Sequence, residues 1–355
     1  MYHFISIALF VANSPIALAS SVLHSPAQIA SWETLAPISL FARQEHTAVF
    51  LPPSTIAILG GVIPANTSDP PVDTTSLMQF YFIHNNTWLT KASVPRALNH
   101  LNSAVVNGKI YVLGGLADAG EKLRKWRAVP DSWVYSPSTD SWDKLPGLPI
   151  REARGSAAVG VYDNKIYLAG GLIDTELFPN GKEHAVPIVS IFDTITATWL
   201  PVPKSTQNIP ESRDHAGAAV VGSKMYILGG RNGGQLHIRD TVFVLDLCNL
   251  KVGWRTSSAK MPTPRGGVAA GAVGTKIFIF GGEGNTAAKS GVFDQVEAYD
   301  TRRDVWESFG RMRLPRHGTY AVGIGKRVYV PGGGVMQGGA PVMNFDVFTP
   351  YKAKT

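Results

Sequence analysis

The stretch Ile277-Phe278-Ile279-Phe280-Gly281-Gly282 decides the fold, because it is one of six variants of the same local pattern. In each variant a short run of apolar, β-favouring residues ends in a glycine doublet. The doublets recur at steps of 51 to 59 residues and are Gly60-Gly61, Gly114-Gly115, Gly170-Gly171, Gly229-Gly230, Gly281-Gly282 and Gly332-Gly333. A strand that recurs with a period near fifty indicates an array of β units. Glycine suits the strand end because the chain leaves it in a conformation that a Cβ would penalise.

The remainder of each unit is consistent with three further strands. An Ala/Val/Gly-rich stretch precedes the doublet strand, and another apolar strand follows the doublet. A tryptophan then opens the last strand of the unit, at Trp88, Trp142, Trp199, Trp254 and Trp306. Four short strands per repeat are typical of a propeller blade. The pattern resembles Kelch repeats over all of the chain after residue 30, and we therefore predict an all-β, six-bladed Kelch-type β-propeller.

The sixth unit has no tryptophan strand of its own, because the chain ends soon after Met343–Phe348. A strand of the missing kind stands at the other end, at Ser31-Trp32-Glu33-Thr34-Leu35. We predict that this N-terminal strand completes the last blade. That arrangement closes the ring and leaves no open sheet edge.

Composition narrows the class of protein. With 45% hydrophobic and 17% charged residues, the 355-residue chain has the composition of a globular protein. The net charge of +7 is scattered, and no long basic run alternates with aromatics, so we expect no nucleic-acid partner. No apolar segment is long enough to span a membrane. The expected partners are apolar small molecules, and we expect a monomer.

The first 19 residues are apolar and carry no Lys, Arg, Asp or Glu, which is typical of a secretory signal peptide. Residues 20–355 are then expected to form one propeller domain in the secretory pathway or outside the cell. Two sequons fit that location and predict glycosylation at Asn66 and Asn85. Cys248 is the single cysteine of the chain, so no intrachain disulfide can form.

Arginines recur 16 to 18 residues before the doublets, at Arg43, Arg96, Arg154, Arg213, Arg265 and Arg316. Two interpretations remain open for them. They hold neighbouring blades together through hydrogen bonds to carbonyls, or they surround the mouth of the central channel and bind a ligand. Recurrence in every blade favours the first interpretation. The longer and less repetitive loops after the doublets indicate that the face around the channel mouth is the binding face, which favours the second.

A second recurring position lies fourteen residues before each doublet and holds His46, His100, Ser156, His215, Gly267 and Gly318. Three imidazoles would crowd one part of the mouth, and the small residues would leave room in the other. The polar neighbours of this position are Glu45, Asn99, Asp214 and His317. Arg231 and Glu283 directly follow doublets. An apolar pocket with a few convergent polar groups is the usual form of a small-molecule site.

Several classes of enzyme lack their ingredients in this sequence. A copper oxidase resembling galactose oxidase needs a Tyr–Cys cross-link and seven blades, whereas Cys248 lies in a turn on the opposite face. There is no His-x-x-x-His spacing, no Gly-x-Ser-x-Gly elbow and no phosphate-binding loop. We therefore expect no metal, no cofactor and no nucleophilic catalysis.

The chain also resembles secreted, single-domain Kelch-like proteins of filamentous fungi in its leader, its Ser31-Trp32-Glu33 entry and its Arg43–Thr47 stretch. That group is similar to the hetero-Diels–Alderases of tropolone–sesquiterpenoid biosynthesis. The resemblance implies a pericyclase that joins a quinone methide to a sesquiterpene polyene in the central pocket. Such a step needs positioning and donors that polarise a carbonyl. The expected catalytic residues are His100, Arg213, His215 and Arg265. The expected substrate-binding residues are Arg43, His46, Arg96, Asn99, Arg154, Arg231, Glu283, Arg316 and His317.

Two alternatives stay open. The sialic-acid mutarotases are secreted Kelch proteins that use a Glu after a blade glycine and an Arg six residues later. Here Glu283 matches, but Lys289 stands at the second position, which puts the transfer of that activity in doubt. The other alternative is a propeller that binds a protein partner.

Overall fold

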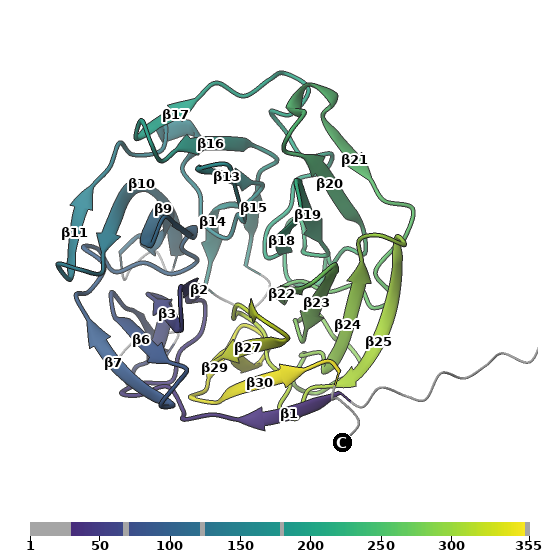
Figure 1. The fold of residues 1–355 in the computed structure, drawn as a ribbon. Helices are drawn as coiled ribbons and strands as arrows, with labels where there is room; N and C mark the ends of the chain where they lie inside the picture. Colours follow the sequence, from purple (N-terminus) through teal and green to yellow (C-terminus); the bar gives the residue numbers. More distant parts are fainter. Residues whose placement is uncertain (1–29, 67–70, 121–124, 178–180, 352–355) are drawn as a thin grey trace, which may run out of the picture.

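The computed structural model describes residues 30–66, 71–120, 125–177 and 181–351. Figure 1 shows these residues as sheets arranged around a central axis, with the N-terminal strand and the C-terminal strand side by side. The expected signal peptide at residues 1–19 lies outside the described residues. Among the described residues, no helix has both the length and the apolar character needed to cross a membrane.

Six blades can be traced in the described part of the chain, each with four strands. The strands of each blade are given below from the axis outward. The first three blades are β2 (Thr47–Leu51), β3 (Thr55–Leu59), β6 (Met78–Phe82) and β7 (Thr87–Lys91); β8 (Ser103–Val106), β9 (Lys109–Asp118), β10 (Lys125–Ser136) and β11 (Ser141–Lys144); and β12 (Ala158–Tyr162), β13 (Lys165–Ala169), β16 (Val189–Asp193) and β17 (Thr198–Leu200). The last three are β18 (Gly217–Val221), β19 (Lys224–Leu228), β20 (Val242–Asp246) and β21 (Trp254–Thr256); β22 (Ala269–Val273), β23 (Lys276–Phe280), β24 (Gln295–Asp300) and β25 (Val305–Arg311); and β26 (Val322–Ile324), β27 (Arg327–Pro331), β30 (Phe345–Thr349) and β1 (Ser31–Thr34). All pairings within the blades are antiparallel, and the predicted six-bladed β-propeller is confirmed.

The last blade is closed by the N-terminal strand, as predicted. β1 pairs antiparallel with β30, and Trp32 lies opposite Phe348. The Trp32 ring also packs edge-on against Phe280 of the preceding blade. The first and last segments of the chain therefore share one sheet, and the ring has no open blade.

Short hairpins and turns lie outside the four strands of each blade. Hairpins form between β4 (Val62–Pro64) and β5 (Val72–Thr74), and between β28 (Gly334–Met336) and β29 (Gly339–Pro341). A third hairpin, β14 (Leu172–Glu176) with β15 (Glu183–Ala185), follows the glycine doublet of the third blade. Its strand β14 pairs with the first residues of β10 in the second blade. The described residues also contain two short 3-10 turns, η2 (Ile150–Glu152) and η3 (Leu250–Val252).

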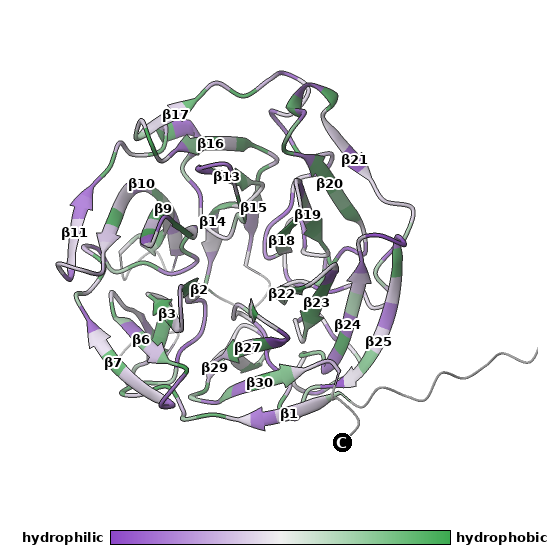
Figure 2. Cartoon of the chain, in the orientation of Figure 1, coloured by the Kyte–Doolittle hydropathy of each residue, from purple (hydrophilic) through white to green (hydrophobic). Residues whose placement is uncertain are grey.

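The core lies between blades rather than inside one layer. Buried apolar side chains of the described residues gather into six clusters, one at each blade–blade interface. Alternation along a strand produces this, because successive side chains point to opposite faces. In β3, Ile56 and Ile58 pack toward the last blade, whereas Ala57 and Leu59 pack toward the second. Figure 2 shows strands such as β20 and β23 as mostly hydrophobic and outer strands such as β11 as more polar.

The tryptophan on the outermost strand of each blade binds that blade to the one before it. The indole Nε1 donates to a backbone carbonyl in the connection that leaves the preceding blade, at 2.9 Å from Trp142 to Ala92 and at 3.2 Å from Trp32 to Arg311. The same bond is made by Trp88, Trp199, Trp254 and Trp306. The recurring tryptophan thus packs and also donates between neighbouring blades.

The glycine doublets fasten the blades on the inner side. The N–H of Gly282 donates to the carbonyl of Arg316 in the next blade, at 3.0 Å. Gly281 has φ of 56°, and a Cβ there would collide with that same carbonyl oxygen. Close approach of two backbones and a left-handed conformation together require glycine. This is the physical reason for the period seen in the sequence.

Candidate functional site

A ring of six equivalent residues surrounds the axis in the described propeller, one from each blade just before its innermost strand. They are Glu45, His100, Ser156, His215, Gly267 and Gly318. All six have left-handed φ, between 51° and 64°. Such a conformation costs a residue with a Cβ about 1–2 kcal/mol. Side chains kept at such positions therefore indicate a role other than stability.

Hydrogen bonds close this ring. The backbone N–H of His100 donates to the carbonyl of Glu45 at 2.9 Å, and the N–H of Ser156 donates to the carbonyl of His100 at 2.8 Å. Gly267, Gly318 and Glu45 continue the pattern around the axis. At the remaining link, the His215 N–H donates to the Ser156 hydroxyl at 3.1 Å. The ring backbone is thus fixed by its neighbours, and its side chains are aimed at the axis.

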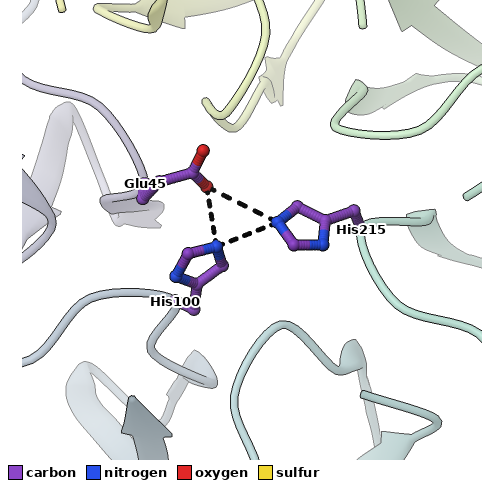
Figure 3. Close-up of side chains that lie close together, drawn as sticks. All are labelled: Glu45, His100 and His215. Atoms are coloured by element: carbon purple, nitrogen blue, oxygen red, sulfur yellow. Dashed lines mark hydrogen bonds and ion pairs between the residues drawn. The ribbon is translucent and has the colours of Figure 1, made fainter. Parts of the chain in front are cut away.

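Three of these side chains meet at the centre, as Figure 3 shows. The Nε2 atoms of His100 and His215 lie 2.9 Å apart. The Oε2 atom of Glu45 lies 3.1 Å from the His100 Nε2 and 3.9 Å from the His215 Nε2. All three residues are buried. A carboxylate and two imidazoles from the first, second and fourth blades therefore converge on one point.

A second layer of polar groups orients the imidazoles. The Nδ1 of His100 lies 2.6 Å from the Oδ1 of Asn99, and the Nδ1 of His215 lies 2.5 Å from the Oδ1 of Asp214. Because these oxygens are acceptors, each Nδ1 carries the proton and donates it. The Nε2 of each ring is left pointing toward the axis.

Arg231 is the cation of the site. It makes two bonds to the Glu183 carboxylate, at 2.7 and 2.8 Å, and it also bonds to the Glu283 carboxylate. Its Nε lies 3.2 Å from the Oδ1 of Asp214. The arginine is only 3% exposed, and three carboxylates surround it. It therefore links the loops of several blades to the second layer around His215.

Burial and charge move the pKa values of the central groups in different directions. Burial raises the pKa of Glu45, but His100 and His215 outweigh it and hold that pKa well below its usual value. Burial lowers the pKa of His100, and Glu45 opposes this only in part. Burial and the Arg231 charge lower the pKa of His215, but Asp214 and Glu45 outweigh them, so this pKa is raised. The two imidazoles that share the axis therefore differ in the direction of their pKa shifts.

Two cavities run along the axis of the described propeller and meet at this cluster. The narrower one, of ≈ 200 Å³, lies among the innermost strands and is lined by small residues such as Ala104 and Gly217. The wider one, of ≈ 700 Å³, lies among the loops that follow the doublets. Glu45, His100 and His215 line both cavities. The cluster therefore stands at the boundary between a loop-lined vestibule and the inner channel.

The vestibule has polar and apolar walls. Arg231, Glu183 and Glu283 line one part of it. Trp126 also lines it, with its ring centroid 5.5 Å from that of His100. The aliphatic contribution comes from Val62, Val72, Leu177 and Leu236. The cavity suits a molecule that has both oxygen functions and an apolar part.

Five of the recurring arginines have a different position from these groups. Arg43, Arg154, Arg213, Arg265 and Arg316 are at most 1% exposed, and none lines either cavity. Each donates to carbonyls of its own blade, as Arg265 does to Gly281 at 2.7 Å and Arg154 to Gly170 at 2.7 Å. These arginines therefore have a structural role, and they bind carbonyls as the first interpretation expected. The carbonyls belong to the arginine's own blade, however, and not to a neighbouring one.

Arg96 is not equivalent to the other arginines. It is exposed at 45% of its side chain and pairs with Asp131 at 2.7 Å. Its place in the repeat is taken by Leu98, whose carbonyl accepts from Gly61 as that of Arg316 accepts from Gly282. The second blade therefore lacks the buried arginine, and Arg96 lines neither cavity.

The alignment of His46 with His100 shifts by one residue in the structure, and Glu45 takes the ring position. The turn between β2 and β3 has three residues, Pro52 to Ser54, whereas the corresponding turn between β8 and β9 has two. Counting fourteen residues back from Gly60 therefore stops one residue short of Glu45. His46 instead points between blades, where its ring approaches Gly332. Sequence reasoning assigned no role to Glu45 for this reason.

The other expected substrate-binding residues lie near the cluster. Asn99 and Arg231 form its second layer, and Glu283 lines the vestibule. His317 is buried behind Glu283, with its Nδ1 3.3 Å from the Oε2 of that carboxylate. Asp214 and Glu183, which received no role from the sequence, complete the network. Asn66 and Asn85 are both exposed, and their glycosylation stays a prediction.

Comparison with known proteins agrees with this architecture. A family model described as the KLHDC2/KLHL20/DRC7 Kelch-repeats domain matches residues 179–333, and a Kelch motif model matches residues 98–149. The Kelch-like protein terF of Aspergillus terreus is 38% identical over 323 residues, which cover 90% of this chain and 68% of that protein. This chain belongs to the Kelch-repeat family.

More distant Kelch relatives are longer than this Kelch protein. Beta-scruin of Limulus polyphemus is 26% identical over 79% of the chain, which corresponds to 29% of that protein. Human Kelch-like protein 25 is 26% identical over 69% of the chain, or 38% of that protein. Among solved structures, that of YjhT superposes with a TM-score of 0.68 and 17% identity, covering 88% of this chain and 95% of that one. At that identity the likeness shows the fold alone.

Proposed function

We propose that this Kelch protein is an enzyme that converts a small molecule at the axis of the propeller. The observation that carries the proposal is the convergence of Glu45, His100 and His215 at the boundary between the two cavities. Convergent titratable groups with displaced pKa values, placed at a cavity, are the usual mark of a catalytic site. The left-handed backbone of these three residues adds to the argument, because glycine would be the easier residue there.

The chemistry of the cluster suits a substrate with a carbonyl or phenolic oxygen. Asp214 and Glu45 raise the pKa of His215 and so favour its imidazolium form, which can polarise such an oxygen as charge develops on it. Trp126 and the aliphatic wall of the vestibule suit an apolar partner held against it. We propose that the reaction is the hetero-Diels–Alder addition of a quinone methide to a sesquiterpene polyene. Positioning of the two partners and one polarising donor supply its acceleration.

A product assay tests this proposal. Wild-type protein is incubated with a quinone-methide precursor and a humulene-type alcohol, and the adduct and its stereochemistry are compared with those formed in buffer. We expect faster formation of one stereoisomer, and a rate lower by about ten- to a thousandfold in His215→Asn. His184→Ala, which removes a surface imidazole, is the matched control and should keep the wild-type rate. An adduct yield equal to that in buffer would exclude the pericyclase.

A second candidate, isomerisation or binding of a sugar, is favoured by one feature of the vestibule. Trp126 lies in the same cavity as Glu176, Glu183 and Glu283. An aromatic face beside carboxylates suits a pyranose ring and its hydroxyls. A panel of monosaccharides, including sialic acid, followed by NMR for anomer exchange and by calorimetry for binding, tests it. If the protein neither accelerates anomer exchange nor binds a sugar of the panel, this candidate is excluded.

A further inference from the structure

The three atoms that meet at the axis have the separations of ligands around one cation. Ligands about 2.1 Å from a transition metal lie about 3.0 Å apart at right-angle coordination and about 3.4 Å apart in a tetrahedron. The three separations here are 2.9, 3.1 and 3.9 Å. The His100 Nε2, the His215 Nε2 and the Glu45 Oε2 therefore already stand close to ligand positions.

The second layer fixes the imidazoles in the form that a metal needs. Asn99 and Asp214 accept the Nδ1–H of His100 and His215, so in each neutral ring the Nε2 lone pair faces the axis. Metal-bound imidazoles usually have a carboxylate or carbonyl in this place. The Nε2 of His100 also faces the Glu45 carboxylate, at 3.1 Å. A divalent ion would satisfy all three atoms.

Neighbouring ring positions leave the other side of such an ion open. The fifth and sixth blades supply Gly267 and Gly318, which have no side chain to fill the axis. At Gly318 a Cβ would collide with the Glu45 carboxylate, so glycine makes room for that ligand. The vestibule adjoins the same three residues. Three protein ligands with open positions beside a cavity are the arrangement of a catalytic rather than a structural metal site.

We propose that Glu45, His100 and His215 bind one divalent transition-metal ion at the axis, with Asn99 and Asp214 orienting the imidazoles. Two imidazoles and one carboxylate suit Zn²⁺ and Fe²⁺. The open positions of the ion face the vestibule. The proposal goes beyond the proposed function, because an ion on the Nε2 of His215 would take the place of the N–H donor that the proposed function assigns to that ring. The three ligands come from three blades, so the sequence contains no local His-x-x-x-His spacing that would indicate the site.

Metal uptake by the whole protein tests the proposal. Wild-type protein is loaded separately with Zn²⁺, Co²⁺ and, under anaerobic conditions, Fe²⁺, then dialysed and assayed for bound metal. We expect one ion per chain, a raised melting temperature and visible absorption bands of Co²⁺ held by imidazole. Comparison of the affinities for Zn²⁺ and Fe²⁺ distinguishes the two ions. Wild-type protein that returns from dialysis free of metal would overturn the proposal.

Variants separate this site from adventitious binding. Glu45→Gln, His100→Asn and His215→Asn should each lose the ion, and Asp214→Asn should weaken binding by about 10- to 100-fold. His184→Ala should bind as wild type does. Retention of the ion by all three ligand variants, or its loss in His184→Ala, would contradict the proposal. If a ligand variant does not fold, the Co²⁺ spectrum of the wild-type protein still decides. If the protein binds metal but forms no adduct, the metal site stands and the pericyclase proposal fails. If it forms adduct but binds no metal, the pericyclase proposal stands and the metal site fails.

Discussion

His46 shows what a single residue does to the pH dependence of this propeller. Its side chain is fully buried, and burial together with the charge of Arg43 lowers its pKa to about 3. The unfolded chain takes up the proton near the ordinary pKa of 6.5, whereas the folded chain stays neutral well below it. A folded-state pKa below the unfolded value means that acid favours the unfolded chain, so this contribution to stability is lost as the pH falls from 6.5 toward 3.

We predict that His46→Leu flattens the acid limb of the stability curve. Between the two pKa values the slope that His46 supplies is at most about 1.4 kcal/mol per pH unit. Denaturant unfolding of the wild-type and variant proteins at a series of pH values between neutral and about 4 measures it. His84→Ala, at an exposed position, is the control. Parallel curves for wild-type protein and His46→Leu would show that His46 does not set the acid sensitivity.

The two kinds of recurring arginine should separate by their effect on folding. Arg265 is fully buried and bonds to Gly281, Thr263 and Glu297. We predict that Arg265→Ala destabilises the protein by about 3–5 kcal/mol, because it leaves the Glu297 charge buried without its partner. Arg96→Ala should change the free energy of unfolding little, since its pair with Asp131 is exposed. A stable Arg265→Ala protein with a selectively lower rate of product formation would return this arginine to the catalytic set.

At the scale of one element, β1 shows how a strand remote in sequence is tied into a blade. Trp32 packs between Phe348 of its own blade and Phe280 of the neighbouring one, and its indole N–H donates to Arg311. We predict that Trp32→Ala costs up to about 3 kcal/mol of stability, the lower end for a tryptophan truncation, because the ring is part-exposed. Trp32→Phe keeps most of the packing and loses the hydrogen bond. Its free energy of unfolding, measured by chemical denaturation, should therefore lie between those of the wild-type protein and Trp32→Ala. Equal stability of all three proteins would show that Trp32 does not hold β1 in the last blade.

At the scale of the molecule, closure makes the blades depend on one another. The inner ring of hydrogen bonds, the tryptophan bonds and the blade–blade clusters all cross the join between the first and last blades. We predict that deletion of residues 1–35 abolishes the single cooperative unfolding transition, because β30 loses its partner and presents an open edge. Deletion of residues 1–29, which leaves β1 in place, is the control. A truncated protein that lacks β1 and still melts in one transition at the wild-type temperature would contradict this.

Much of the architecture could be predicted from the sequence because its causes are local. The Gly-Gly steps mark the close approach of two backbones, the tryptophans mark the outer strands, and the orphan strand at Ser31–Thr34 marks the closure. Each of these depends on residues a few positions apart, so it repeats visibly along the chain. The apolar character of successive residues in the inner strands likewise follows from their position between two blade interfaces.

The candidate site could be predicted only in part. His100 and His215 emerged from the repeat, but Glu45 was hidden by a turn that is one residue longer in the first blade. The arginines looked like mouth residues because the period places them beside the ring, and only their burial shows that they bind carbonyls. Asp214, Glu183 and Arg231 come together from different loops, and their partnership leaves no pattern in the sequence.

By itself, then, the sequence determined the repeat, the number of blades and the way the ring closes, since these follow from glycine conformation and strand alternation within each unit. Tertiary structure alone decided which side chains share the axis. Glu45, His100 and His215 are 55 and 115 residues apart along the chain. They meet because six blades bring equivalent left-handed residues to one ring, where burial and the Asn99 and Asp214 oxygens set their charge and direction.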